Sequence, residues 1–537
     1  MADAPAPEIR TKPPCSRQDA AAVVARLRGS GHVAYFAGGC VRDALLGLEP
    51  KDYDVATDAP PKRVRQLFPQ TQAVGAAFGV ILVRHGPSTI EVATFRTEGT
   101  YTDGRRPDSV RFTTAAEDAQ RRDFTINGLF LDPAEGSGLR VQGSESTAHA
   151  TTHLDPTRLG HFSDRVPRPE DNEPTGGESP CPILSSDLGE TVVSGAPLPP
   201  TTPAPRPPIS SPPPLLHPTP HGTILDYVGG VADLRASLLR AIGDPRARFA
   251  EDHLRLLRAV RFAARFGLSI DPATAAAIRD NATKLRGISP ERIAEELRLM
   301  LTPPTRAAAW PALWEFALID VIMRFVPGAP GVDVEAADLD PARSFFLRVA
   351  PDEPISFGLA LAAAVLDYRL QSLPDTGPAL EARLLAMLSR ADVQRMGRAV
   401  REALRVSNEE LDEMLHTLEP LATLLAPDPL RVATCKRFLA RPTAPQTLRL
   451  ITAIADLGWF APTIARLRDQ LDPIIQSDET PAPTPLITGD DLKHLGLKPG
   501  PLYKRLLDDV YDAQLEARVT TRNQALDLAT QLAQPRP

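Results

Sequence analysis

Two aspartates, Asp52 and Asp54, stand two residues apart in the run DYDVAT. If this run is a strand, both carboxylates point to one face while Tyr53 and Val55 point to the other. Carboxylates held that close repel each other unless a cation lies between them, and Mg2+ prefers such oxygen ligands. The spacing therefore predicts that Asp52 and Asp54 are catalytic metal ligands for phosphoryl transfer. A solvated surface strand is the alternative for an isolated pair of this kind.

A glycine pair upstream of the aspartates gives the backbone room to meet a phosphate. In FAGGCVRDALLG a β-rich run ends at Gly38 and Gly39, and we expect a helix to start at about Val41. Backbone N–H groups and the positive end of that helix then face a phosphate with no side chain in the way. Arg42 adds a guanidinium fork for triphosphate oxygens. A simple tight turn is the alternative, and the acidic run downstream favours the phosphate site.

Further polar residues are candidates for the same pocket. Glu91, in TIEVATFR, lies on a later candidate strand and is a candidate third catalytic acid near the metal, unless it is only exposed. Arg96, Arg121 and Arg122 are candidate phosphate clamps, with ordinary surface arginines as the alternative.

Two pairs of residues are candidates for recognising the sugar and the base. Asp123 and Asn127 are spaced i and i+4 in RRDFTIN, where an acid accepts a bond from a ribose hydroxyl and so favours ribonucleotides. Asp252 and Arg255 are i and i+3 in EDHLRLLR, so we expect them on one helical face. They then match the base edges of cytosine and adenine and reject guanine and uracil. Arg258 is a further nucleotide-binding candidate, and a plain surface ion pair is the alternative for Asp252 with Arg255.

The surrounding elements predict an α/β or α+β unit followed by helices. Short β-rich runs alternate with helical ones as far as LFLDP, and after ILDYV the pattern is helical almost to the end. Leu256, Val260, Ala263 and Phe266 recur at helical spacing, and Ser289 is a candidate N-cap.

A region rich in Pro, Ser, Thr and Gly interrupts this order. It holds much of the surplus among 56 prolines, and it cannot bury enough apolar surface to offset its ordering entropy. The predicted segments are a disordered N-terminus (1–18), the head (19–136), a Pro-rich disordered insert (137–221), the end of the head (222–243), a helical neck (244–305), a helical body (306–480) and a helical tail (481–537).

Composition narrows the class of protein. The net charge of −7 gives no global positive field, so a polyanionic partner would bind a local patch. The 4 cysteines are scattered without a CxxC pair, which argues against a zinc site and a disulfide framework. The chain has no signal-like or membrane-spanning run, so we expect a cytoplasmic protein with no membrane partner.

These residues resemble the class II tRNA nucleotidyltransferase and bacterial poly(A) polymerase family, within the DNA polymerase beta superfamily. The matching runs cover most of residues 30 to 305: GGCVRDALLG with DYDVAT, EVATFRTEGTYTDGRRPDSVRF, RRDFTINGLFLDP, ILDYVGGVADL, EDHLRLLRAVRFAARFGL and SPERIAEEL. Their order and spacing fit the family apart from the insert, which should loop out of the head.

The resemblance implies an α+β fold, with a nucleotidyltransferase head containing a mixed sheet and an all-helical neck, body and tail. It implies Asp52 and Asp54 as Mg2+ ligands, Asp123 at the ribose, and Asp252 with Arg255 as the protein template for CTP or ATP. Glu291 and Arg292 resemble a neck-stabilising motif. Residues from Arg96 to Pro107 resemble a flexible loop associated with switching between these nucleotides.

Three functions remain open at this stage. The main hypothesis is an enzyme that adds CCA to tRNA 3′ ends from CTP and ATP, and the first alternative is an A-adding or poly(A)-making enzyme. VGAAFGVILV lacks the basic run expected there in a dedicated poly(A) polymerase. The third is a non-catalytic RNA-binding protein whose Pro-rich insert docks a protein partner, against which the intact Asp52 and Asp54 argue.

Overall fold

We analysed a computed structural model of the chain. It describes residues 15–75, 79–98, 110–133, 213–324, 326, 339–371, 378–477, 480–497 and 500–533. Most of the predicted disordered N-terminus, most of the Pro-rich insert with its predicted protein partner, and most of the predicted flexible loop lie outside these residues.

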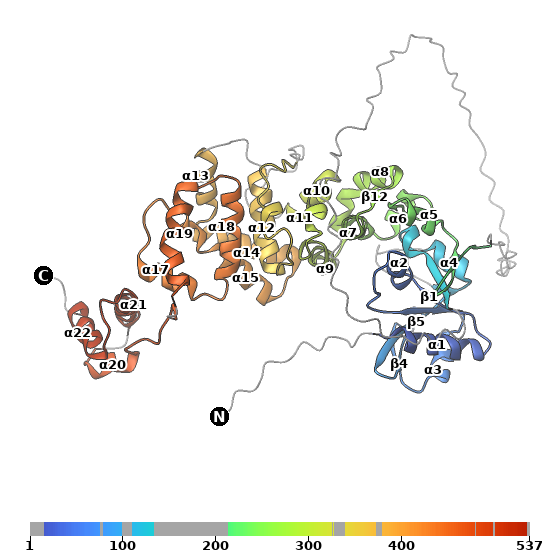
Figure 1. Ribbon diagram of the computed structural model, residues 1–537, viewed down its shortest axis with the longest axis horizontal. Coiled ribbons are helices and arrows are strands. Elements are labelled where there is room, and N and C mark those ends of the chain that lie inside the picture. The colour runs from blue at the N-terminus through green and yellow to red at the C-terminus, as the bar shows by residue number, and fades with distance from the viewer. Residues whose placement is uncertain are drawn as a thin grey trace, which may run out of the picture. The chain divides into compact units, whose positions relative to one another are not determined.

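The head is built on an eight-stranded sheet with the strand order β3-β4-β5-β2-β1-β8-β10-β9. Strands β2 and β5 run parallel, and the other neighbouring pairs run antiparallel. The mixed sheet of the α+β prediction is therefore confirmed (Figure 1). The strands are β1 (Ala34–Ala37), β2 (Asp54–Thr57), β3 (Thr71–Gly75), β4 (Val80–His85), β5 (Ser88–Thr94), β8 (Leu129–Pro133), β9 (Leu215–Thr219) and β10 (Gly222–Asp226).

The two faces of the sheet are covered differently. Helices α1 (Arg17–Gly29) and α3 (Pro61–Leu67) pack against the face that carries Val55 and Val92. Ala37, Ala56 and Phe130 belong to a separate apolar cluster, which also includes residues of α4 (Ala115–Gln120). Side chains alternate between faces along a strand, so Asp54 shares the face of Ala56. That face is covered only in part, which leaves Asp54 exposed.

Smaller elements complete the head. They are α2 (Gly39–Leu45), the hairpin of β6 (Arg96–Glu98) with β7 (Val110–Phe112), the 3-10 turn η2 (Thr125–Asn127), α5 (Gly230–Arg235), and β11 (Leu238–Leu239), which pairs with β12 (Ser269–Ile270).

Three predicted boundaries are wrong. Strand β9 falls inside the predicted insert, because it pairs with β10 from Leu215↔Asp226 to Thr219↔Gly222. Its Pro218 misled the prediction, but proline is tolerated in an edge strand, and β9 is at the end of the sheet. Helix α1 begins at Arg17, inside the predicted disordered N-terminus, because Ser16 caps it by accepting from the backbone N–H of Asp19. Helix α2 begins at Gly39 rather than at about Val41.

The rest of the described chain is helical, as predicted. The neck helices are α6 (Pro245–Glu251), α7 (Arg255–Phe266), α8 (Pro272–Asn281) and α9 (Pro290–Leu301), with the 3-10 segment η4 (Ala282–Gly287) before α9. Leu256, Val260 and Ala263 are buried along α7, and Ser289 occupies the N-cap position of α9 without a side-chain capping bond. The predicted helical spacing in α7 is thus confirmed.

The body and tail continue this helical layout. The body contains α10 (Arg306–Glu315), α11 (Leu318–Met323), the 3-10 turn η5 (Phe346–Arg348), α12 (Phe357–Gln371), α13 (Pro378–Met387), α14 (Arg390–Leu404), α15 (Asn408–Leu418), α16 (Leu421–Leu424), α17 (Val432–Leu439), α18 (Ala444–Asp456) and α19 (Ala461–Ile475). The tail contains α20 (Gly489–His494), α21 (Pro501–Leu515) and α22 (Arg522–Ala533), and it has its own apolar core.

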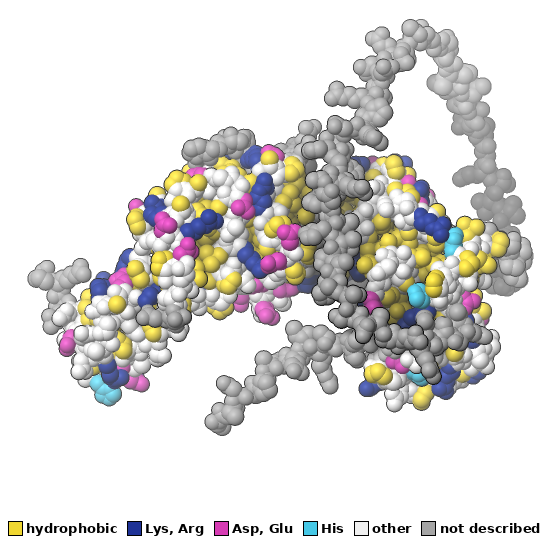
Figure 2. Space-filling model, in the orientation of Figure 1, with side chains coloured by type: hydrophobic (Ala, Val, Ile, Leu, Met, Phe, Trp, Pro, Cys, Tyr) yellow, Lys and Arg dark blue, Asp and Glu magenta, His cyan; other side chains and the backbone are white. Residues whose placement is uncertain are grey.

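The visible surface carries no single large charged patch. On the face in view, Figure 2 shows Lys and Arg side chains interspersed with Asp and Glu side chains over the helical part. None of the described helices is both long and apolar enough to cross a membrane.

Candidate nucleotide and metal site

Asp54 lies directly beside the glycine turn. It pairs with Ala37 in the antiparallel register of β1 and β2, and Gly38 follows Ala37 in the chain. Asp54 also lies near the thiol of Cys40, and burial together with the Asp54 carboxylate raises the pKa of Cys40 to about 12. The sheet therefore places an aspartate at the start of α2.

Tyr53, the residue between the two aspartates, packs against the apolar core, whereas both aspartates are exposed. The ring centroids of Tyr53 and Phe36 are 5.5 Å apart, and Val55 is fully buried. Strand β2 begins only at Asp54, so Asp52 precedes the ladder rather than belonging to it. The predicted alternation of faces nevertheless extends through Tyr53.

Glu91 is placed next to the same point of the sheet. Strand β5 pairs in parallel with β2, and the first matched residues are Val55 and Val92. Glu91 and Asp54 each precede a member of that pair, so they lie on one face of neighbouring strands. Glu91 is exposed like Asp54. The register thus brings a third carboxylate to the face of the sheet on which Asp54 lies.

The side chain of Arg122 packs against the turn at Gly38. Gly38 has a φ of +70°, and a Cβ atom there would lie 2.9 Å from Nη1 of Arg122. That nitrogen donates to the backbone oxygen of Asn127 at 3.0 Å. Only glycine fits both the backbone conformation and the contact. Arg122 is consequently the predicted clamp residue that lies nearest the turn.

Asp118 binds the three predicted clamp arginines, and no motif or spacing had marked it as a site residue. Its carboxylate accepts from the backbone N–H of Arg96 at 3.2 Å, from Nε of Arg121 at 2.9 Å and from Nη2 of Arg122 at 3.1 Å. Burial raises the pKa of Asp118, but Arg122 and Arg121 outweigh it, and the net shift is downward. Asp118 therefore stays ionised and holds two guanidinium groups beside the turn.

Four of the predicted nucleotide-binding residues bind one another. Nη1 of Arg42 donates to Oδ1 of Asn127 at 2.5 Å, and Nδ2 of Asn127 donates to Oδ1 of Asp123 at 2.9 Å. Nε and Nη2 of Arg258 donate to Oδ2 of Asp123 at 2.9 and 2.6 Å. Burial raises the pKa of Asp123, but Arg258 and Asn127 overcome it and lower the pKa to about 2.

Arg42 is enclosed rather than open to solvent. Its side chain also donates to Asp43, and its guanidinium lies 4.3 Å from the ring centroid of Phe266 and 5.2 Å from that of Phe262. Burial lowers the pKa of Arg42, with Asp43 opposing the shift. The arginine predicted to hold triphosphate oxygens thus also packs the head against α7.

The prediction that Asp252 and Arg255 share a helical face is wrong. Asp252 is the C-cap of α6 with an extended backbone, and α7 begins at Arg255. Asp252 instead accepts from the backbone N–H of Leu254 at 3.0 Å and from Nη2 of Arg292 at 2.7 Å. The extended residue breaks the helical run, so the i, i+3 spacing no longer makes the two side chains helical neighbours. The contact with Arg292 fits its predicted neck-stabilising role.

One buried carboxylate in the neck escaped the sequence analysis. Glu296 of α9 is 5% exposed and accepts from Nε of Arg261 at 2.6 Å, and its Oε1 lies 3.9 Å from Nη1 of Arg258. It lies among the apolar residues Ile293, Leu297 and Met300 of the same helix. A charged residue inside an apolar helical stripe is the signal that would have found it.

The carboxylates near the glycine turn are suitable ligands for a hard cation. Asp52, Asp54 and Glu91 offer exposed carboxylate oxygens, which suit Mg2+ and not a soft metal. The described residues contain no ready cluster of 3 or more metal-ligating side chains. Cys15, Cys40 and Cys435 are buried and form no disulfide within the described residues.

Comparison with known proteins matches this geometry. Residues 34–142 match the poly A polymerase head domain, and residues 267–329 match a family described as a probable RNA and SrmB-binding site of polymerase A. The chain is 29% identical to a CCA-adding enzyme of Lacticaseibacillus paracasei over 516 residues, covering 96% of both chains.

Two further comparisons extend the match. The chain is 32% identical to a CCA-adding enzyme of Geobacillus thermodenitrificans over 57% of its own length, and it spans 54%, about half, of that relative. It shares its fold with the crystal structure of the Bacillus stearothermophilus CCA-adding enzyme in complex with CTP, at a TM-score of 0.57, 24% identity and coverage of 97% and 98% of the two chains. The chain therefore carries a match to the poly A polymerase head domain over residues 34–142 and is similar to a CCA-adding enzyme over nearly its whole length.

Proposed function

We propose that this protein is a nucleotidyltransferase that adds CCA to tRNA 3′ ends from CTP and ATP without a nucleic-acid template. The observation that carries the proposal is the position of Asp54, paired with Ala37 at the glycine turn and flanked by Glu91 on β5. These contacts support the proposal because Asp54, Glu91 and the glycine turn lie on or directly after the neighbouring strands β2, β5 and β1. The similarity to CCA-adding enzymes supports CCA as the sequence that is added.

In the reaction, the 3′-hydroxyl oxygen of the RNA bonds to the α-phosphorus of the nucleotide, and pyrophosphate leaves. Asp52 and Asp54 would hold Mg2+, which supplies activation of that hydroxyl and neutralises charge on the triphosphate. The Gly38 turn lets backbone N–H groups approach the phosphates, and Arg122 brings positive charge beside them.

The sugar and base are assigned to residues on the other side of the turn. The ionised Asp123 and the neutral amide of Asn127 are assigned to the ribose, and Arg258 fixes the Asp123 carboxylate. Arg255 donates two hydrogen bonds through Nη1, and we assign its Nε and Nη2 to the base edge. Asp252, held by Arg292, supplies the acceptor.

We further assign the chain's segments to steps of this function. We assign residues 16–133 and 213–243 to the catalytic head, 244–305 to the neck that carries the base-reading residues, and 306–480 and 481–537 to the body and tail that grip tRNA. The head assignment includes β9, because this strand completes the sheet.

The test is nucleotide incorporation into tRNA that lacks its last three nucleotides. Purified protein and Mg2+ are incubated with this RNA and labelled CTP alone, ATP alone, or both, and the products are resolved at single-nucleotide length. The proposal predicts two additions with CTP alone and a third only when ATP is added. ATP incorporation into tRNA that already ends in CC, without CTP use, would indicate an A-adding enzyme, and long tails from ATP a poly(A) polymerase. No incorporation under any condition would support the non-catalytic alternative.

A further inference from the structure

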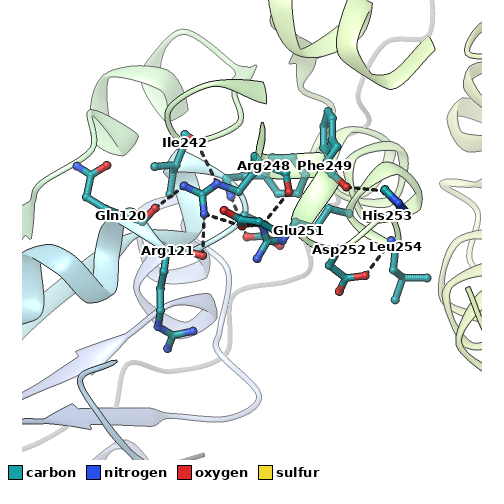
Figure 3. Close-up of polar contacts among 12 residues, drawn as sticks. Gln120, Arg121, Ile242, Arg248, Phe249, Glu251, Asp252, His253 and Leu254 are labelled. Atoms are coloured by element: carbon teal, nitrogen blue, oxygen red, sulfur yellow. Dashed lines mark hydrogen bonds and ion pairs between the residues drawn. The ribbon is translucent and has the colours of Figure 1, made fainter. Parts of the chain in front are cut away.

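Arg248, on α6, lies where the head meets the neck, and its side chain reaches groups on both sides. Nη2 donates to the backbone oxygen of Gln120 at 2.7 Å, and Nη1 donates to that of Arg121 at 3.2 Å. Nε donates to the backbone oxygen of Ile242 at 3.1 Å. Figure 3 shows the guanidinium group between these carbonyls and Glu251. The side chain is 13% exposed, and its contacts with Arg121 and Ile242 are partly buried, whereas the contact with Gln120 is exposed.

On the head side, Arg248 fixes the end of α4. The carbonyls of Gln120 and Arg121 belong to the last turn of that helix and its C-cap, where backbone oxygens lack helical partners. The next residue is Arg122, which lies against the Gly38 turn, and Asp123 follows. Arg248 thereby anchors the segment that carries the phosphate and ribose candidates.

On the neck side, Arg248 orients Arg255. Nη1 of Arg248 donates to Oε2 of Glu251 at 3.0 Å, and the same Oε2 accepts from Nη1 of Arg255. Nη1 of Arg255 also donates to the backbone oxygen of Arg248 at 2.9 Å. Both contacts involve one nitrogen of Arg255, so they fix the plane of its guanidinium and leave Nε and Nη2 for a base edge.

We propose that Arg248 is a positioning residue for base selection, which sets the placement of Arg255 relative to the α4 end and its phosphate- and ribose-binding residues. This inference rests on the proposed function, in which Arg255 reads the base. A planar fork with five N–H donors can meet carbonyls and a carboxylate in fixed directions, whereas the single ammonium of lysine cannot. The charge of Arg248 is thus less important than its geometry.

The experiment measures base discrimination in the full-length enzyme. The readout is the ratio of kcat/KM for CTP to that for UTP on tRNA lacking its CCA end, in wild type, Arg248→Ala, Arg248→Lys, Arg255→Ala and the double variant Arg248→Lys/Arg255→Ala. The ratio is independent of the fraction of folded enzyme, so a loss of stability alone leaves it unchanged. If Arg248→Ala does not fold, Arg248→Lys keeps the test intact.

Arg246 provides the matched control on the same helix. Its side chain is 71% exposed and pairs with Asp280, away from α4 and Arg255. We expect Arg246→Lys to keep the wild-type ratio. We expect Arg255→Ala and Arg248→Lys each to lower it about 10-fold, within the range that one bidentate base contact provides.

The double variant decides whether the two residues act together. If Arg248 acts through Arg255, the double variant has the ratio of Arg255→Ala alone. A wild-type ratio in Arg248→Lys, or additive losses in the double variant, would overturn the inference while leaving base reading by Arg255 intact. An unchanged ratio in Arg255→Ala would overturn both the base-reading assignment and the inference that depends on it.

Discussion

The head–neck junction and the helical body each bury an aspartate, and the two are stabilised in opposite ways. Asp123 at the junction is bound by the guanidinium of Arg258, and although burial opposes it, its pKa falls to about 2. Asp367 in the body accepts from neutral donors, Trp310 Nε1, Ser344 Oγ and the N–H groups of Phe345 and Phe346, and burial raises its pKa to about 6.

The difference distinguishes ionised carboxylates near the proposed nucleotide site from a buried acid that connects helices of the body. Arginine partners keep carboxylates ionised around the glycine turn, where a polyphosphate must be met by fixed charges and dipoles. In the body, an acid without a cationic partner serves to connect α12 to α10 and to the residues before η5. Asp54 differs from both buried aspartates, because it is exposed at the start of β2.

Replacing the exposed acid should have the largest effect on activity. We expect Asp54→Asn to lower kcat for CTP addition about 10^3-fold, because losing a metal ligand forfeits several kcal/mol of transition-state stabilisation. The measurement is single-turnover incorporation, with thermal melting to verify the fold. The matched control is Asp58→Asn, an exposed aspartate one residue beyond the other end of β2, where it accepts from the Val33 N–H at 2.9 Å. Equal rates for the two variants would remove Asp54 from the metal site.

Neutralising the acid at the junction should have the next largest effect. Asp123→Asn leaves Arg258 without its carboxylate, so we expect kcat/KM for CTP to fall about 100-fold as the ribose contact is misplaced. The depressed pKa means that Asp123 stabilises the fold above about pH 4, by about 2 kcal/mol, and that this contribution disappears as the pH falls towards 2. Urea unfolding of both proteins at pH 7 and pH 3 measures this, and an undiminished difference at pH 3 would contradict it.

The body aspartate should behave with the opposite sign and spare activity. Its folded-state pKa of about 6 exceeds the ordinary 3.8, so the folded state retains a proton that the unfolded chain releases. Its contribution therefore makes the protein about 3 kcal/mol less stable above pH 6 than below pH 4. Asp367→Asn removes this titration and should flatten that part of the stability profile between pH 4 and 6, with kcat changed less than about 2-fold. A profile that matches wild type would reject the assignment.

The smallest effect is expected for a segment that belongs to neither region. Deleting residues 140–210 should leave CCA addition within about 2-fold of wild type, because this segment cannot bury a core. Deleting residues 140–220 removes β9, which pairs along β10, and should lower the melting temperature. Loss of activity in the shorter deletion would assign the segment a role in catalysis or tRNA binding.

Local patterns were sufficient for the elements that carry the site. Alternation in DYDVAT predicted that Tyr53 and Val55 would point away from the face of the aspartates, and Gly38 was identified from its place between a strand and a helix. The spacing of apolar residues predicted α7 for the same reason, since each pattern reports one repeat of one element.

Partners across the fold were not predictable in this way. Which acid binds Arg258 depends on the contact of α7 with the head, and nothing in RRDFTIN specifies it. Asp252 was misplaced because a single extended residue ends α6 without a Gly or Pro to mark it. Strand β9 was missed because its pairing with β10 outweighs the breaking effect of Pro218.

Metal binding at the start of β2 is the most direct test of the central claim, that Asp52 and Asp54 hold the catalytic metal. Mn2+ replaces Mg2+, and its binding is followed by electron paramagnetic resonance at a fixed CTP concentration in wild type, Asp52→Asn/Asp54→Asn and Asp58→Asn. We predict that the double variant binds Mn2+ at least about 10-fold more weakly than wild type, while Asp58→Asn is unchanged. Equal affinity in all three proteins would contradict the claim that Asp52 and Asp54 hold the catalytic metal.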